Sequence, residues 1–176
     1  NIPDTDAIKS YLQDKKPRSA VVVGGGFIGL EMAENLHDQG LKVSIVEMLD
    51  QVMAPIDYEM AQIVHEHLKT KGVDLHLKDG VSKFEYGNGS TTITLQSGAQ
   101  VSGDIIILSI GIRPNGELAK AAGLEQNQRG GIVVDKYLKT SDDSIYAIGD
   151  VIEVEDYVNK VQTMVPLAGP ANKQGR

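Results

Sequence analysis

A chain of 176 residues with no cysteine excludes disulfide bridges, thiolate metal sites and thiol chemistry carried out by these residues. Its length suits one domain with a substantial core, and 41% hydrophobic with only 5% aromatic residues is typical of an α/β fold. The net charge of −7 disfavours nucleic acid as a partner. No apolar run approaches the roughly 20 residues of a membrane span, so we expect a soluble, cytoplasmic protein.

Residues 1–16 predict a linker helix. A turn and capping cluster opens the segment, the apolar residues Ile8, Tyr11 and Leu12 fall on one side of a helical pattern, and Pro17 ends it. The segment is too short to form a domain of its own.

A strand–helix–strand unit comes next. Ser19–Val23 is a continuous apolar run, which is typical of a strand buried on both faces of a parallel sheet. From Ile28 to Leu36 apolar residues recur every four positions, which indicates a helix, and Gly40 fits the left-handed position that closes it. Lys42–Val46 predicts the second strand.

A second helix and a third strand follow before the helical periodicity ends. Asp57 is a good N-cap, a helical stripe runs from Met60 to Leu68, and Val73–Leu77 predicts the third strand. Strand alternation then replaces helical periodicity in three segments separated by glycine-containing hairpin signals. These segments are 81–86, 90–96 and 99–101, and they predict an antiparallel meander.

The remaining elements are shorter and less regular. They are a buried strand at 104–110, a short helix at 117–122, and strands at 132–134 and 144–148. Beyond Asp150 the pattern weakens, and we expect the chain to end part-way through an element. The predicted fold class is α/β, a Rossmann-like parallel sheet with an inserted three-stranded antiparallel meander. We divide the chain into a linker helix, 1–16, a central domain, 17–135, and a return segment, 136–176.

Three glycines between the first strand and the first long helix match a dinucleotide-binding loop. In Gly24-x-Gly26-x-x-Gly29 the first glycine permits a tight turn, the second lets a diphosphate approach the backbone, and the third lets the helix pack closely. The triplet alone could be an ordinary glycine-rich turn. Its place between a buried strand and a helix favours a phosphate site at the helix N-terminus.

Glu47 supplies the acid that such a loop requires. It stands at the end of the second strand, where its carboxylate can accept hydrogen bonds from the adenosine ribose and would repel a 2′-phosphate. Met48, Leu49 and Asp50 provide no cation to offset that repulsion. The sequence therefore favours NAD(H) over NADP(H), although a solvated glutamate at a strand end remains the alternative.

The histidines do not indicate a metal site. His65 and His67 are two positions apart on a predicted helix and point to nearly opposite faces, and no pair four positions apart occurs on a helix. Ser109 forms no nucleophile elbow, so a hydrolase is not indicated. We expect neither a metal ligand nor a catalytic residue in this chain.

Three segments together resemble the pyridine nucleotide–disulfide oxidoreductase family. Val21–Glu34 is similar to the fingerprint of its NAD(P)H domain, 109–115 to its alanine-threonine-glycine loop, and 140–150 to its second flavin-binding motif. Ser109 and Ile110 depart from the first two letters of that loop. The inserted meander also fits the family's NAD(P)H domain.

Further segments resemble particular members of the family. Residues 32–37, 47–53 and 167–176 look most like coenzyme A disulfide reductases and NADH oxidases. Some coenzyme A disulfide reductases prefer NADPH, which is a preference opposite to the one that Glu47 favours.

The resemblance also implies roles for single residues. Phe27 would cover a flavin and move aside for nicotinamide, Glu31 would hold the nicotinamide end, and Gly111 would lie against the cofactor. Asp150 would meet the ribityl chain of FAD. Phe27 could instead be a core aromatic, Glu31 a charge that complements the helix dipole, and Asp150 a turn cap. The predicted cofactor-binding residues are Gly24, Gly25, Gly26, Phe27, Ile28, Gly29, Glu31, Glu47, Met48, Val81, Ile110, Gly111 and Asp150.

The function implied is the NAD(H)-binding domain of a flavin-dependent oxidoreductase. Such a protein passes hydride from nicotinamide to FAD and on to a disulfide, persulfide or oxygen acceptor, and this chain would not be catalytically complete by itself. Its partners would be NAD(H) and a flavin domain of the same parent chain, the parent being a homodimer through a C-terminal domain. The alternatives are a stand-alone dinucleotide-sensing module, a methyltransferase, and a loop that holds FAD in place of NAD.

Overall fold

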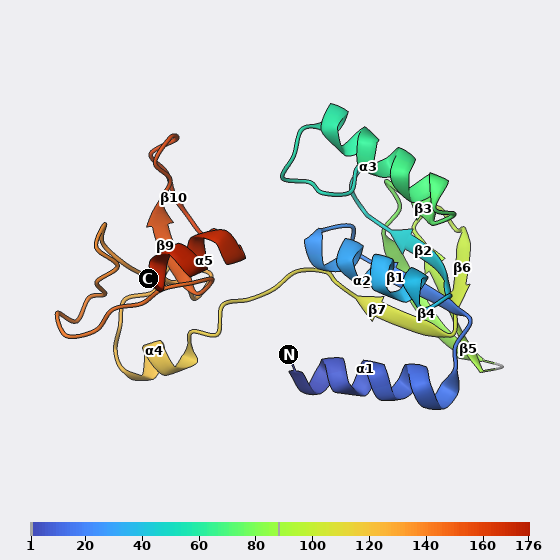
Figure 1. The fold of residues 1–176 in the computed structure, drawn as a ribbon, viewed down its shortest axis with the longest axis horizontal. Helices are drawn as coiled ribbons and strands as arrows, with labels where there is room; N and C mark the ends of the chain where they lie inside the picture. The colour runs from blue at the N-terminus through green and yellow to red at the C-terminus, as the bar shows by residue number, and fades with distance from the viewer. Residues whose placement is uncertain (1, 88) are drawn as a thin grey trace. The chain divides into compact units, whose positions relative to one another are not determined.

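The computed structural model describes residues 2–87 and 89–176, which fall into two compact units that divide after Gly111 (Figure 1). The elements of the first unit are α1 (Ile2–Lys15), β1 (Ser19–Val23), α2 (Phe27–Asp38), β2 (Lys42–Val46), α3 (Tyr58–Thr70), β3 (Asp74–His76), β4 (Val81–Gly87), β5 (Ser90–Leu95), β6 (Gln100–Gly103) and β7 (Ile105–Leu108). Those of the second are α4 (Glu117–Ala121), β8 (Ile132–Val133), β9 (Ile152–Glu155), β10 (Gln162–Thr163) and α5 (Ala168–Gln174).

A four-stranded parallel sheet in the order β3-β2-β1-β7 forms the centre of the first unit. Val23 of β1 stands in register with Val46 of β2 and with Leu108 of β7, so three strands reach their carboxyl ends at the same edge. The predicted α/β class, with a parallel sheet and a separate three-stranded antiparallel sheet in the order β4-β5-β6, is confirmed.

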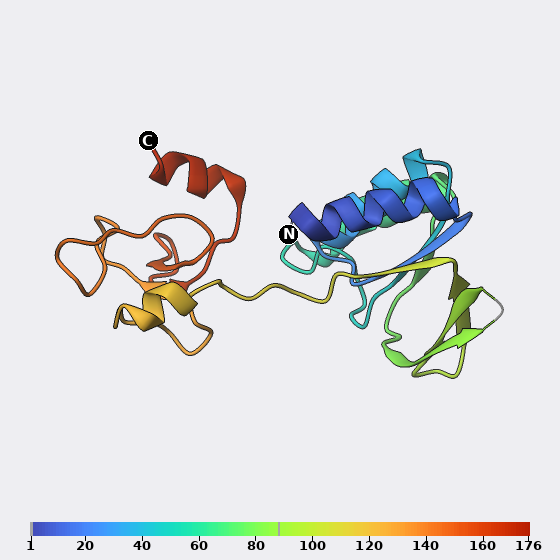
Figure 2. The same ribbon diagram turned by 90° about the horizontal axis from the view of Figure 1, so that it is seen from below.

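Both faces of the parallel sheet are buried (Figure 2). Alternate β1 residues point to opposite sides: Ala20 and Val22 pack against Leu36 and its neighbours on α2. Val21 and Val23 pack with Ile93 and further residues of the meander. A strand covered on both faces needs apolar residues at every position, which explains the uninterrupted run in β1.

The linker helix, α1, is tied to the sheet by apolar packing and by a hydrogen bond. Leu12 packs on the core cluster beside α2, and the Tyr11 hydroxyl donates to the carbonyl oxygen of Asp104, 2.9 Å away. The Asp104 carboxylate accepts the backbone N–H groups of Arg18 and Ser19, which joins the start of β1 to the start of β7. These hydrogen bonds hold the pKa of Asp104 below its usual value.

The second unit departs most from the predicted elements. The strand expected at 144–148 is wrong, because this segment forms a single isolated bridge, Tyr146 opposite Lys139, at the end of a tight turn that side chains stabilise. The Thr140 hydroxyl donates to the carbonyl oxygens of Asp142 and Ile145, and the Asp142 carboxylate accepts the Ser144 N–H. The short elements β9, β10 and α5, which the weak pattern beyond Asp150 did not predict, complete the unit.

Pairing within the second unit also bears on the division of the chain. β8 pairs with β9 in parallel, Ile132 opposite Ile152, and β9 pairs with β10 antiparallel. Residues 112–135 thus share a compact unit with the segment expected to start at 136. The structural division after Gly111 therefore differs from the boundary at 135 that the sequence suggested.

Two glycines of the loop are required by the fold itself. Gly24 has φ +106°, a conformation that side chains disfavour, and a Cβ there would collide with the carbonyl oxygen of Ser109. A Cβ on Gly29 would collide with the carbonyl oxygen of Gly24. The start of α2 can approach the end of β1 only because both positions lack side chains.

Gly29→Ala is expected to lower the free energy of unfolding by about 2 kcal/mol or more, since neither backbone can yield without moving helix or strand. Urea unfolding followed by circular dichroism measures the loss. Gly87→Ala is the control, because a Cβ there meets nothing within 4 Å, and it should stay within about 0.5 kcal/mol of the wild type. Equal stability of the two variants would contradict this packing.

Candidate functional site

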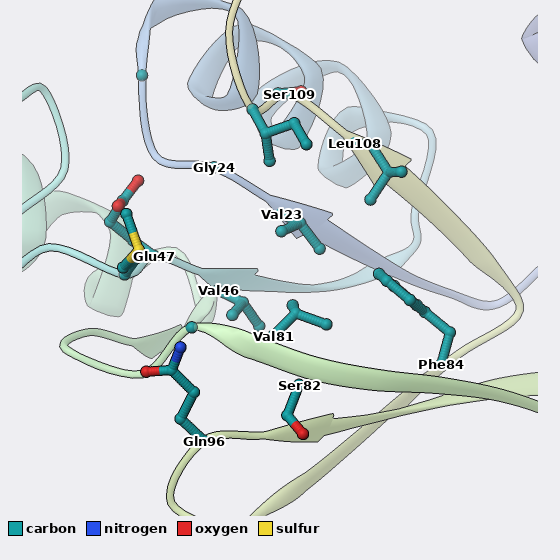
Figure 3. A pocket seen from close by; sticks show the side chains of 14 residues that line it. Val23, Gly24, Val46, Glu47, Val81, Ser82, Phe84, Gln96, Leu108 and Ser109 are labelled. Carbon is teal, nitrogen blue, oxygen red and sulfur yellow. The ribbon is translucent and has the colours of Figure 1, made fainter.

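A cavity of about 540 Å³ lies where β1, β2 and β7 end (Figure 3). The parallel strands and the glycine loop form one wall, and the first strand of the meander forms the other. The residues that line it are Val23, Gly24, Gly26, Val46, Glu47, Met48, Gly80, Val81, Ser82, Phe84, Gln96, Leu108, Ser109 and Ile110. Crevices at the carboxyl ends of parallel strands are the usual ligand sites of open α/β sheets.

The glycine loop presents unpaired backbone donors at this cavity. The Gly24 N–H donates to the Val46 carbonyl. The first hydrogen bond of α2 runs from the Leu30 N–H to the Gly26 carbonyl. Within residues 2–87 and 89–176 the amides of 26–29 have no hydrogen-bond acceptor. An α-helix leaves its first N–H groups free and carries about half a positive charge there, so the start of α2 can bind an anion.

Glu47 lies at the mouth of the same helix. Its Oε2 accepts the Gly25 N–H at 2.6 Å and its Oε1 accepts the Leu49 N–H at 2.8 Å. A carboxylate offers about four lone-pair sites, so two amides leave room for two further donors. The acid and the free amides of the loop are thereby brought together, as the sequence predicted.

Gly26 has no structural reason to be glycine. Its φ of −76° and ψ of −175° are open to any residue, and a Cβ there would meet nothing within 4 Å. It lines the cavity, whereas the loop's other glycines are required by the fold. The bare position therefore fits a group that comes close to the backbone from outside, as a dinucleotide diphosphate would.

The loop between β2 and α3 packs against Gly25, the residue that donates to the Glu47 carboxylate. Val52, which is fully buried, packs on Gly25, and Met53 N donates to the Gly25 carbonyl at 2.8 Å. Behind it lies His65 of α3, buried to 3% exposure, whose Nε2 accepts the Val52 N–H at 3.1 Å. Burial, helped by Lys69 and opposed by Glu66, lowers the pKa of His65.

The structure brings together six of the predicted site residues and separates the others. Gly24, Gly26, Glu47, Met48, Val81 and Ile110 line the cavity. Gly25 and Gly29 lie directly behind it. Phe27 and Glu31 line a different hollow, between α2 and α3, and Ile28 is half exposed on α2.

Two further predicted residues are not among those that line this cavity. Gly111, exposed and with φ +115°, is the last residue of the first unit. Asp150 belongs to the second unit, where it lines a hollow with Arg113 and Arg129.

Sequence reasoning identified Val81 but missed Ser82 and Phe84, the other residues of β4 that line the cavity. Phe84 and Val81 point from β4 toward the parallel strands, and Leu108 faces them from β7 (Figure 3). Strict alternation would place positions 81 and 84 on opposite faces. The pairing of β4 with β5 shifts by one residue between Val81 and Lys83, and such a bulge turns both side chains to one side. No sequence signal marked Phe84 and Leu108, because their exposure is visible only in the structure.

Nowhere in the described chain do three or more metal-binding side chains gather. Among the helices that the structure describes, none has the length and apolar character needed to cross a bilayer.

The family model for pyridine nucleotide-disulphide oxidoreductases matches residues 1–175. The chain belongs to this family. That membership agrees with the resemblance found in the sequence and sets aside the methyltransferase alternative. The chain spans 38–41% of the length of the curated relatives it matches.

The relatives that match include coenzyme A disulfide reductases and an NADH oxidase, the members of the family that the sequence resembles. The chain is 54% identical to the reduced CoADR-RHD of Bacillus anthracis, with a TM-score of 0.92 over 100% of this chain and 31% of that one. It is 30% identical to the coenzyme A disulfide reductase of Staphylococcus haemolyticus over 98% of this chain and 38% of the relative. It is 29% identical to the water-forming NADH oxidase of Lactobacillus brevis bound to NADH, with a TM-score of 0.84 over 95% of this chain and 37% of that one; an engineered variant of that oxidase is bound to NADPH.

The lowered pKa of His65 makes stability depend on pH. Below the ordinary value of about 6.5 the unfolded chain takes up a proton that the folded chain resists. The contribution of neutral His65 is therefore complete above that value and declines as the pH falls toward the folded pKa. We expect His65→Gln to lose less unfolding free energy than the wild type between about pH 7.5 and about pH 5.5. Urea unfolding at both pH values measures this, and identical losses would contradict it.

Proposed function

We propose that this chain is the NAD(H)-binding part of a flavin-dependent oxidoreductase. The parent protein would take hydride from a nicotinamide cofactor and pass it through FAD to a disulfide, persulfide or oxygen acceptor. One observation carries the proposal: free amides at the start of α2 and the Glu47 carboxylate meet at one cavity. The chain's own part is binding and orientation, whereas hydride chemistry is supplied by the cofactors when they are bound.

The start of α2 is suited to the diphosphate of the dinucleotide. The amides of 26–29 can donate to its oxygens, the helix dipole favours its charge, and Gly26 leaves the approach open. The first turn of α2 contains no acidic residue that would oppose an anion.

Glu47 favours NAD(H) over NADP(H). Its carboxylate keeps lone pairs for the ribose hydroxyls, whereas a 2′-phosphate there would face a like charge, and Met48 and Leu49 beside it carry no cation. The Lactobacillus brevis oxidase supports this electrostatic rule. The form bound to NADPH carries substitutions that remove one aspartate and introduce two arginines.

The apolar part of the cavity suits the adenosine end. Phe84 and Leu108 are 47% and 58% exposed, so each offers an apolar surface that a flat base can cover. Both line the same cavity as Glu47, whose carboxylate would bind the ribose next to the adenine. An adenine ring between the meander and β7 would leave the diphosphate directed at the start of α2.

The remaining roles are carried by the resemblance to the family. Phe27 and Glu31 would meet the flavin and the nicotinamide end, Gly111 would lie against the cofactor, and Asp150 would contact the FAD ribityl chain. The linker helix and the return segment would join a flavin domain of the parent. The homodimer and the cytoplasmic location likewise stay predictions.

Gly26→Val tests the diphosphate site. The branched side chain would fill the space before the amides, and losing two charged hydrogen bonds should raise the Kd for NADH at least about 100-fold. The fold should persist, because the backbone angles suit any residue and the space is empty. Fluorescence titration with NADH measures the change, with Gly87→Val as the control at another open glycine. Retained affinity in a folded Gly26→Val variant would count against the site.

Substitution at the acid tests the choice of cofactor. The wild type should bind NADH about 10-fold or more tighter than NADPH. Glu47→Ala combined with Met48→Arg should reverse that order, because a repelling charge is replaced by an attracting one. Parallel titrations with the two cofactors measure the ratio, and Glu59→Ala, an exposed acid on α3, serves as the control. Superimposable curves for NADH and NADPH on the wild type would overturn the assignment.

A further inference from the structure

A buried histidine of α3, His65, accepts a hydrogen bond from the loop between β2 and α3. His65 and Ala61 are the buried residues of α3, at a spacing that usually carries apolar side chains. The imidazole Nε2 lies 3.1 Å from the amide nitrogen of Val52, a fully buried residue of the loop. A second contact closes the same loop, since the Gln51 amide donates to the Ile56 carbonyl at 2.8 Å.

Hydrogen-bond chemistry fixes the state of the ring. A backbone amide can only donate, so Nε2 must carry a lone pair and the proton of the neutral ring must be on Nδ1. Nδ1 lies 3.3 Å from Oε1 of Gln62, whose amide nitrogen donates to the Tyr58 carbonyl at 3.2 Å. Each polar atom thereby has one consistent role. Burial, which lowers the pKa of His65, favours the same neutral form.

The contacts continue from the loop to the dinucleotide site. The Val52 side chain packs so closely on Gly25 that a Cβ added at residue 25 would lie 2.8 Å from Val52 Cγ1. Met53 N holds the Gly25 carbonyl at 2.8 Å, and Gly25 N–H is held by Glu47 at 2.6 Å. Three successive contacts therefore join the imidazole to the carboxylate, through Val52 and Gly25.

We propose that His65 is a positioning residue of the dinucleotide site: by accepting the Val52 N–H it seats Gly25 against Glu47 and so sets the affinity for NAD(H). This inference rests on the proposed function. A purely structural role, in which the ring only satisfies a core amide, would lower stability and leave the affinity of the folded protein unchanged.

Two substitutions separate these roles. His65→Leu keeps an apolar volume but removes the acceptor, and the Kd for NADH should rise about 3- to 30-fold, the range of coupling through packed contacts. His65→Gln retains an acceptor at the end of its side chain and should restore binding to within about 2-fold of the wild type. Glu59→Leu places the same apolar side chain on an exposed position of α3 and should not alter binding. Titrations use the full chain under conditions where circular dichroism shows each variant folded.

The outcomes are distinct. Folded His65→Leu with wild-type affinity overturns the inference and leaves the proposed function standing, whereas failure of the wild type to bind NADH removes the proposed function itself. If His65→Leu does not fold, Gln62→Met decides, because it removes the acceptor of the Nδ1–H and leaves the ring held by the Val52 N–H alone. The Kd for NADH should then rise about 3-fold, at the lower end of the same range. An unchanged Kd in folded Gln62→Met would overturn the proposal.

Discussion

The short hydrogen bond from the Gly25 N–H to the Glu47 carboxylate is the contact on which the site depends. It ties the turn after β1 to the end of β2, so the acid and the start of α2 keep a fixed spacing. The bond also consumes the amide nearest the acid while the amides of 26–29 stay free. One polar contact thereby divides the loop into a part used by the fold and a part open to a ligand.

The sheet supplies the frame for that contact. Because β1 is covered by α2 on one face and by the meander on the other, its end cannot move independently of either layer. The meander therefore has two roles: Ile93 closes the core, and Phe84 forms the far wall of the cavity. The meander, which interrupts the alternation of strands and helices, thus forms one wall of the cavity.

Local chemistry made part of this architecture predictable. Three glycines at fixed spacing and an acid after the second strand follow from the geometry of a strand–turn–helix unit, so Gly24, Gly29 and Glu47 could be placed from sequence. Phe84 could not, because a bulge changes its face without a mark in the pattern. His65 was not assigned to the site, since its partner is a backbone amide of a distant loop that no spacing rule predicts. The strand expected at 144–148 is reduced to one bridge between Lys139 and Tyr146, because the turn that Thr140 and Asp142 stabilise leaves no length for a ladder.

The most direct test is to follow the backbone amide signals of the ¹⁵N-labelled chain during a titration with NADH. The account predicts that the signals of Phe27, Ile28 and Gly29 shift in proportion to saturation, together with those of Gly25 and Leu49, which donate to Glu47. Shifts confined to other parts of the chain, with these amides unmoved at saturation, would contradict it.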